Sequence, residues 1–206
     1  MKPKMLSDRD YFLLELTDTF LDPQTIFQND NPLYIEIGCG KGEFISQYAP
    51  LHPTWNFIGF EAAEKRIRNT LKKLSPEQHP NVRLVRLLVN ANIAQHLKPE
   101  SVEGAFIQHP DPWPKRRHHK RRLIQQNFLT ALATVLAADA QVHISTDHDE
   151  YANWIAEEFV KNPNFLSLHD HPIQKSPSLD DHVVTWYETE QRRLGYEPNY
   201  MLFKRI

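Results

Sequence analysis

The feature that most constrains the fold is a short apolar run followed at once by a glycine-rich turn. Residues 33–37 (LYIEI) predict a buried strand, Gly38, Gly40 and Gly42 form the turn, and residues 43–49 predict a helix. This order opens the nucleotide-binding half of a parallel α/β sheet, because glycine lets the backbone approach a ligand and the helix start offers free N–H groups. A plain tight turn between strand and helix is the alternative.

Two acids beside the turn bear on the kind of ligand that it would hold. Glu36 lies two residues before Gly38, and Glu43 stands where a dinucleotide-binding fingerprint has its last glycine. Carboxylates at these positions would repel a pyrophosphate and would favour a cofactor with a cationic end. S-adenosyl-L-methionine (SAM) fits better, since it carries a sulfonium, an ammonium and no phosphate. We interpret Cys39, inside the turn, as a small packing residue.

The rest of the chain predicts a doubly wound α/β domain with a seven-stranded, mostly parallel sheet and helices on both faces. Further strands are predicted over residues 55–60, 82–89, 102–108, 141–145, 165–168 and 183–187, with a small edge strand over 200–204. Helices are predicted over 8–20, 62–74, 123–138 and 151–160, a loop over 170–182, and a charged turn or short helix over 188–195. We expect a single domain, residues 1–206, with 1–31 as an N-terminal helix and linker.

Polar residues follow the predicted strands at the edge where open parallel sheets bind ligands. Glu61 closes the second strand about 20 residues past the glycine turn, where such folds bind a ribose. Glu61 could also be present because the helix dipole favours an acid at a helix N-terminus, and both interpretations can hold together. Asn90 follows the third strand and is a candidate for an adenine contact, while Asp111 and Asp147 follow the fourth and fifth. Their agreement predicts one ligand site at this edge.

Residues 108–122 (QHPDPWPKRRHHKRR) form the most unusual stretch of the chain. Three prolines in five positions exclude a helix or a central strand there, so Asp111 and Trp113 are expected on a stiff loop. Six of the eight residues over 115–122 are Lys or Arg, and the other two are His. Charge this dense repels itself unless a polyanion faces it. The stretch predicts a grip on a phosphate backbone beside an oriented base; a solvated basic loop is the alternative.

Composition narrows the class of protein. The chain has 206 residues, 40% hydrophobic and 11% aromatic, which indicates a globular domain with a normal core. Its net charge is only −2, so attraction to a partner must come from local patches. The single cysteine excludes an internal disulfide, and the histidines show no metal-ligand spacing. With no signal-like or membrane-length apolar run, we expect a cytoplasmic protein without a metal or membrane association.

These motifs together resemble one family, the bacterial tRNA (guanine-N7-)-methyltransferases. The matching pieces span most of the chain and are EIGCGKG (36–42), GFE (59–61), PDPWPKxRHxKRR (110–122), STD (145–147) and TxxE with a later glycine (185–188 and 195). The resemblance implies a Rossmann-like, class I SAM-dependent methyltransferase fold. It also implies tRNA rather than DNA as the partner, a guanine in the variable loop as the target, and 7-methylguanosine as the product. A monomer and a homodimer both remain open.

The resemblance also assigns residues to roles. The implied cofactor ligands are Glu36, Gly38, Gly40, Glu61, Asn90 and Asp111, with Asp111 also the active-site acid. The implied contacts to the substrate guanosine are Lys115, Asp147, Thr185, Trp186, Tyr187 and Glu188. The implied RNA contacts are Arg117, His118, His119, Lys120, Arg121 and Arg122. One departure is that the family usually has Asp-Ala after the third strand, where this chain has Asn90-Ala91.

The predicted chemistry needs no general base, because guanine N7 carries an in-plane lone pair and no proton. Asp111 and Asp147 are therefore expected to accept hydrogen bonds from the guanine edge, and Trp113 either stacks on a base or braces the loop. One rival hypothesis is methylation of an exocyclic adenine amine, which also uses an Asp-Pro-aromatic loop after a fourth strand. Another is an RNA-binding module without catalysis, which a SAM titration would distinguish.

Overall fold

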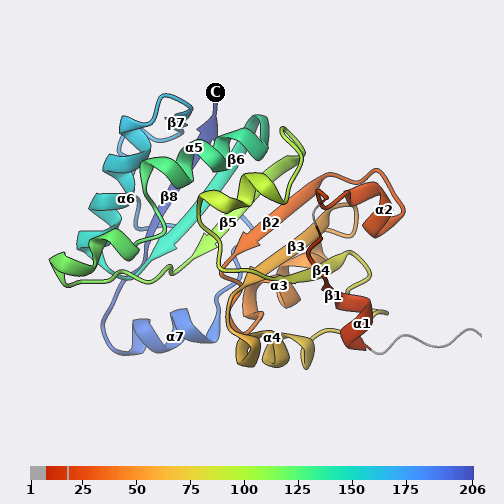
Figure 1. Ribbon diagram of the computed structural model, residues 1–206. Coiled ribbons are helices and arrows are strands. Elements are labelled where there is room, and N and C mark those ends of the chain that lie inside the picture. The colour runs from red at the N-terminus through yellow and green to blue at the C-terminus, as the bar shows by residue number, and fades with distance from the viewer. Residues whose placement is uncertain (1–7, 18) are drawn as a thin grey trace, which may run out of the picture.

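The computed structural model describes residues 8–17 and 19–206 and contains one eight-stranded sheet in the order β1-β4-β3-β2-β5-β6-β8-β7 (Figure 1). The strands are β1 (Leu13–Leu14), β2 (Leu33–Ile37), β3 (Asn56–Glu61), β4 (Val82–Arg86), β5 (Val102–Gln108), β6 (Leu136–Thr146), β7 (Phe165–Ser167) and β8 (Asn199–Arg205). All neighbouring pairs from β1 to β6 are parallel, and β8 is antiparallel to both β6 and β7. The predicted α/β class and mostly parallel sheet are confirmed, with eight strands instead of seven.

Helices cover both faces of the sheet, as predicted. They are α1 (Asp8–Phe12), α2 (Pro23–Phe27), α3 (Glu43–Tyr48), α4 (Glu64–Leu71), α5 (Gln126–Val135), α6 (Asp149–Lys161) and α7 (Trp186–Arg193), with 3-10 turns η1 (Ala49–Leu51), η2 (Ala91–Gln95) and η3 (Arg116–Arg121). Side chains alternate along each strand, so Phe57 joins an apolar cluster with α3 and α4 while Ile58 joins the larger cluster with α5 and α6. Both strand residues are fully buried.

The predicted strand over 183–187 is wrong. Thr185 instead caps a helix, since its hydroxyl accepts a hydrogen bond from the backbone N–H of Glu188 at 3.1 Å and α7 starts at Trp186. The β-branched and aromatic run favours a strand only where a neighbouring strand is available to pair with it. The small edge strand predicted over 200–204 is an interior strand, β8, and the strand at the sheet edge is β7.

Several predicted boundaries also shift. The helix predicted over 8–20 ends at Phe12, and β1 follows at once; residue 18 of that range lies outside the described residues. The polar linker over 24–31 contains most of α2, which starts at Pro23. The strand predicted over 82–89 ends at Arg86, and the helix predicted over 123–138 covers only 126–135 because β6 begins at Leu136. Leu136 is fully buried and pairs with Val102 of β5, which explains the early strand.

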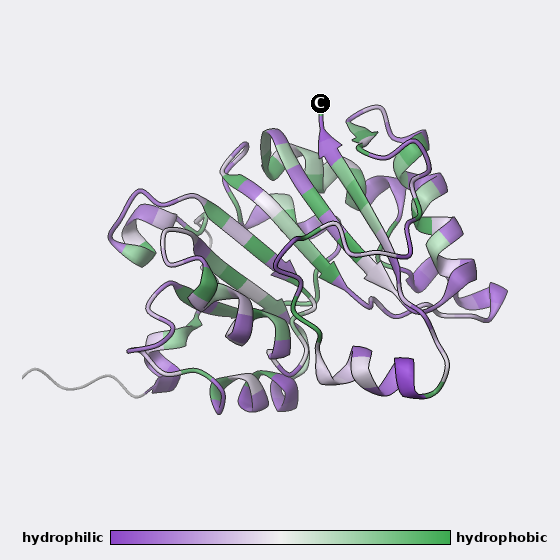
Figure 2. Cartoon of the chain, turned by 180° about the vertical axis from the view of Figure 1, so that it is seen from behind, coloured by the Kyte–Doolittle hydropathy of each residue, from purple (hydrophilic) through white to green (hydrophobic). Residues whose placement is uncertain are grey.

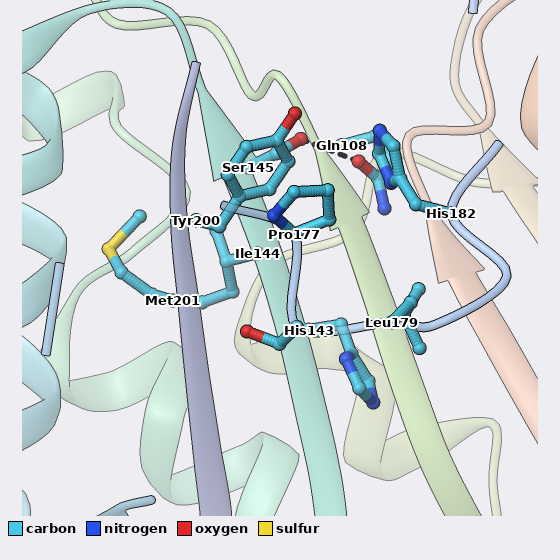
Figure 3. Close-up of a pocket in the computed structure, with 10 residues that line it drawn as sticks. Gln108, His143, Ile144, Ser145, Pro177, Leu179, His182, Tyr200 and Met201 are labelled. Atoms are coloured by element: carbon cyan, nitrogen blue, oxygen red, sulfur yellow. Dashed lines mark hydrogen bonds between the residues drawn. The ribbon is translucent and has the colours of Figure 1, made fainter. Parts of the chain in front are cut away.

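The parallel strands end at a common edge, below which α7 lies (Figure 1). The chain between β7 and β8 crosses one face of the sheet before it forms α7, and α7 carries mainly hydrophilic residues (Figure 2). The crossing segment leaves a cavity of about 10 Å³ against β5, β6 and β8. Its walls include Pro177, Leu179 and His182 from the segment and His143 and Tyr200 from the sheet (Figure 3). This segment thus covers the part of the sheet face that α3 and α4 leave uncovered.

Among residues 8–17 and 19–206, no helix is both long and apolar enough to cross a bilayer. The same residues include no group of three or more His, Cys, Asp or Glu side chains arranged to hold a metal ion.

Candidate functional site

A cleft of about 600 Å³ lies at the carboxyl edge of the parallel strands, in the size range of small-molecule sites. Its lining comes from the ends of β2, β3, β4 and β5 and includes Gly38, Glu61, Asn90, Asp111 and Arg121. The first four of these are positions predicted as cofactor contacts, and the fifth is a predicted RNA contact. The structure therefore brings the glycine turn and the 108–122 loop to one cavity.

The glycine turn has the backbone shape that only glycine adopts without strain. Gly38, Gly40 and Gly42 have φ angles of 79°, 58° and 71°. At Gly42 a side chain is also excluded by space, because its Cβ would stand 2.3 Å from a side-chain carbon of Thr70 on α4. At Gly38 the Cβ position is open. The turn is thus packed against α4 on one side and open on the other.

Glu61 ties the end of β3 to this turn. One carboxylate oxygen accepts a hydrogen bond from the Gly40 N–H at 3.1 Å, and the other accepts from the Ala63 N–H at 2.8 Å. Arg66 lies 3.5 Å from the first oxygen and also lines the cleft, a position that the sequence reading missed. Only 4% of Glu61 is exposed, yet the oxygen that accepts from Ala63 keeps a second lone pair for a ligand hydroxyl.

Glu36 lies behind the turn and is buried. Burial raises the pKa of its carboxyl to about 8, against a backbone hydrogen bond from Ile45, and the nearby Glu61 carboxylate acts in the same direction as burial. Its Oε2 has no hydrogen-bond partner. Burial likewise raises the pKa of the Cys39 thiol, so this cysteine remains an uncharged packing residue.

The 108–122 loop presents its acid to solvent. Asp111 is exposed, Trp113 is half-buried, and His109 and Trp113 have positive φ angles of 48° and 42°. The guanidinium of Arg121 lies 5.0 Å from the Trp113 ring centroid, and His118 meets that ring edge-on at 5.9 Å. These contacts favour the reading in which Trp113 braces the loop. The predicted basic stretch includes a short 3-10 helix, η3.

Most of the predicted RNA contacts are accessible. Arg117, Lys120 and Arg121 are exposed, and His118 and His119 are half-buried. Lys115, a predicted substrate contact, is exposed at the start of the same turn.

Arg122 differs from these cations, and its prediction as an RNA contact needs correction. None of its side chain is exposed; the guanidinium pairs with Glu150 of α6, and its Nε donates to the Pro112 carbonyl oxygen at 2.9 Å. The rings of Tyr151 and Trp154 lie 5.0 and 4.8 Å from it. Arg122 therefore anchors the loop to the domain instead of facing a partner.

Asp147 forms a second acidic position at the edge, beside two residues from other elements. The Tyr187 hydroxyl donates to Asp147 Oδ2 at 3.0 Å, and His109 Nδ1 lies 3.7 Å from Oδ1. Burial acts to raise the pKa of Asp147, but His109 and Tyr187 outweigh it and hold that pKa below its ordinary value. Asp147 is therefore a carboxylate at neutral pH. His109 was missed by the sequence reading, although its place directly before Pro110 and Asp111 was a usable signal.

The four residues predicted as guanosine contacts over 185–188 begin α7 and divide by exposure. Trp186 and Tyr187 are 60% and 40% exposed, whereas Thr185 and Glu188 are buried. The Glu188 carboxylate accepts hydrogen bonds from Arg192 and from the Tyr200 hydroxyl, and lies 2.8 Å from His182 Nε2. Burial opposes ionisation of Glu188, but these partners outweigh it and lower its pKa to about 2. Its side chain holds α7 in place.

Asn90 lies beyond the end of β4 and caps η2. Its side-chain oxygen accepts a hydrogen bond from the Asn92 N–H at 2.8 Å, and the side-chain oxygen of Asn92 accepts one from the Asn90 N–H. Asn90 lines the cleft, where its side-chain NH2 can donate to a ligand.

Comparisons with known proteins agree with this geometry. A family model described as "Putative methyltransferase" matches residues 30–200. A tRNA (guanine-N(7)-)-methyltransferase from Geobacillus thermodenitrificans is 40% identical over 166 residues, covering 79% of this chain and 74% of that protein. One of the same name from Bacillus subtilis is 33% identical over 179 residues, covering 85% and 81%.

Solved structures extend the likeness to the fold. The 16S rRNA methyltransferase KamB superposes with a TM-score of 0.61 at 13% identity, over 94% of this chain and 98% of that one. An rRNA methylase from Streptococcus thermophilus gives a TM-score of 0.55 at 13% identity, over 86% and 89%. The predicted class I methyltransferase fold is confirmed. The chain belongs to the tRNA (guanine-N(7)-)-methyltransferase family.

Proposed function

We propose that this protein transfers a methyl group from SAM to N7 of a guanine in the variable loop of tRNA, giving 7-methylguanosine. The names of its relatives support this activity. The structural observation that carries it is that one cleft joins the acidic glycine turn to the Asp111 loop and its exposed cations.

The residues of the cleft suit SAM. The Glu61 carboxylate lines the cleft, and the buried Glu36 carboxyl behind the turn keeps an unpartnered Oε2. The negative charge of Glu61 favours a cationic cofactor over a phosphate. When bound, SAM supplies an electrophilic methyl group on its sulfonium. We assign its binding to Glu36, Gly38, Gly40, Glu61, Asn90 and Asp111.

The chain's own contribution to the reaction is orientation. Guanine N7 has a lone pair and no proton, so no residue has to act as a base. Asp111, exposed at the cleft, and Asp147, kept ionised by His109 and Tyr187, are assigned as acceptors for the N1–H and amino group of guanine. Holding reactants in line and excluding water can contribute roughly 7–11 kcal/mol. Asp111 is thus the proposed catalytic residue, acting as an orienting acceptor.

The surface around the cleft is assigned to the nucleotide and its RNA. Lys115, Thr185, Trp186 and Tyr187 would contact the target guanosine, with Glu188 supporting α7 from behind. The RNA backbone would be held by Arg117, His118, His119, Lys120 and Arg121, which are exposed or half-buried. Such contacts give salt-dependent affinity without reading sequence.

We further propose that residues 1–206 form a single methyltransferase domain. The stretch 1–31, expected as a helix and linker, also contributes β1 to the sheet and contains α2. A tRNA substrate favours a cytoplasmic location and gives no role to DNA. The proposal holds for a monomer and for a homodimer.

The test is to incubate the protein with labelled SAM and an unmodified tRNA transcript, digest the RNA, and identify the labelled nucleoside. We expect 7-methylguanosine. A matched transcript with 7-deazaguanosine at the target position lacks the N7 lone pair and should take up no label. Labelled N6-methyladenosine would replace this proposal with the exocyclic-amine reaction, and failure to bind SAM in a titration, with no methyl transfer, would favour the RNA-binding module.

A further inference from the structure

The start of α7 is capped by a carboxylate from another helix. Glu43 Oε2 accepts a hydrogen bond from the backbone N–H of Trp186 at 2.9 Å. Trp186 is the first residue of α7, so this N–H is among the donors that a helix cannot satisfy internally. A negative charge at a helix N-terminus is also favoured by the helix dipole. Glu43 therefore fixes the position of the first turn of α7.

The contact originates in the glycine turn itself. Glu43 directly follows Gly42 and is the first residue of α3, and Lys41 directly precedes Gly42. The Lys41 ammonium lies 5.5 Å from the centroid of the Trp186 ring. Both neighbours of Gly42 thus reach Trp186. The other carboxylate oxygen of Glu43 lies 3.4 Å from Lys73 Nζ, just beyond α4, which holds the carboxylate from the opposite side.

The other ties of this segment lead to different parts of the sheet. Asp181 pairs with His52 at 2.6 Å, behind α3, and Tyr187 donates to Asp147 after β6. Trp186 itself is 60% exposed, so little apolar packing holds it. Its own backbone N–H and ring are contacted by Glu43 and Lys41.

We propose that Glu43 is a positioning residue, which aligns the guanosine-binding start of α7 with the glycine turn that holds the cofactor; Lys41 contacts the same residue of α7. This rests on the proposed function. Neither residue lines the cleft, so neither is assigned a contact with the reacting atoms. The effect of Glu43 is on alignment, and a misplacement of about 1 Å can cost on the order of 100-fold in rate.

Three variants separate this role from its alternatives. Glu43→Ala removes the acceptor for the Trp186 N–H. Glu43→Gln removes the charge but keeps a carbonyl oxygen that can accept the same hydrogen bond. Lys73→Ala removes the ion-pair partner of Glu43 and leaves the Trp186 hydrogen bond in place.

We expect Glu43→Ala to lower kcat about 10- to 100-fold at saturating SAM and tRNA. The Kd for SAM and the Kd for tRNA should stay within about twofold, because the cofactor and RNA contacts are untouched. The amide hydrogen of residue 186 should exchange faster with solvent, a readout that needs no activity. Glu43→Gln and Lys73→Ala should keep kcat and amide exchange near the wild-type values.

A wild-type kcat in folded Glu43→Ala would overturn the proposal. So would a rise in the Kd for SAM that matches the loss of rate, because Glu43 would then be a cofactor ligand. Equal defects in Glu43→Ala and Glu43→Gln would assign the effect to charge instead of the hydrogen bond, again contrary to the proposal. Failure of the proposed function is seen separately, in the nucleoside made by the wild-type protein.

Discussion

Arg122 and Glu150 form a two-pronged ion pair beneath the loop that carries Asp111, with N–O distances of 3.1 and 2.5 Å. The arginine side chain is fully buried, while 53% of the glutamate side chain is exposed. Because the same guanidinium donates to the Pro112 carbonyl, it joins the proline-rich part of the loop to α6. Arg122, the last cation of the basic run, thus anchors the loop that carries the other, exposed cations.

Replacing Arg122 with Leu should lower the free energy of unfolding by about 1–3 kcal/mol, since it removes buried charge-assisted hydrogen bonds while Glu150 stays partly hydrated. Urea unfolding measures the change. Arg117→Leu is the matched control, because Arg117 is exposed and should shift stability by no more than about 0.5 kcal/mol. Equal stability of Arg122→Leu and wild type would contradict the anchoring role.

Replacing Arg117, Lys120 and Arg121 together with Gln should weaken tRNA binding and flatten its dependence on salt. The slope of log K against log salt should fall by roughly 0.7–0.9 for each phosphate that the protein no longer neutralises. Binding isotherms at several salt concentrations give the slope, and SAM affinity should not change. Lys98, Lys161 and Lys204, converted to Gln on other parts of the fold, are the control. An unaltered slope in the first variant would show that these cations contact no phosphate and that the loop is only a solvated surface.

Glu61→Ala should weaken SAM binding by about 1–3 kcal/mol, because it removes the acceptor offered to the cofactor and releases the Gly40 and Ala63 N–H groups. Calorimetric titration with SAM measures the change. Glu64→Ala, at the start of α4 and paired with Arg9 and Arg68, should bind SAM like the wild type. A wild-type affinity for SAM in folded Glu61→Ala would show that Glu61 is not a cofactor ligand.

Glu36 should make stability dependent on pH. Burial raises its pKa in the folded protein to about 8, from an ordinary value of 4.5, so the folded state retains a proton that the unfolded chain releases. The free energy of unfolding should therefore fall as pH rises from 4.5 to about 8. Glu36→Gln imitates the protonated acid and should flatten this part of the curve. Urea unfolding of the ligand-free proteins at about pH 5 and about pH 8 compares them; parallel curves would contradict the assignment.

Asp111→Asn should reduce methyl transfer roughly 10- to 1,000-fold, the effect of losing one or two charge-assisted hydrogen bonds of about 1.5–3 kcal/mol each. The product should remain 7-methylguanosine, because the variant orients the base poorly but leaves the nucleophile unchanged. Nucleoside analysis identifies the product, and rates from about pH 6 to 9 test for a base. A new basic limb in the pH profile of the variant would indicate that Asp111 removes a proton.

The part of the sheet around β2 and β3 could be predicted from the sequence, because the residue pattern of each strand agrees with its final place in the fold. The glycine turn directly follows one of these strands and Glu61 ends the other; both strands are recognisable from their apolar residues, and the turn and Glu61 line the expected cleft. Predictions failed where distant partners decide. The run over 183–187 has strand-like residues, but Glu43 and Thr185 cap a helix that begins at Trp186, within this run. Arg122 was grouped with its charged neighbours, because its partner on α6 lies 28 residues further along the chain.

The position of β8 between β6 and β7 has a consequence for how the sheet assembles. Among the residues that the structure describes, β7 pairs with no strand other than β8. Although β7 comes earlier in the chain, it is connected to the sheet only through β8, which lies antiparallel on β6 and pairs Gln141 with the distant Lys204. Pairings between residues so far apart in sequence form slowly. The Tyr200 hydroxyl that donates to Glu188 belongs to β8, so this tie between α7 and the sheet can form only once β8 is in place.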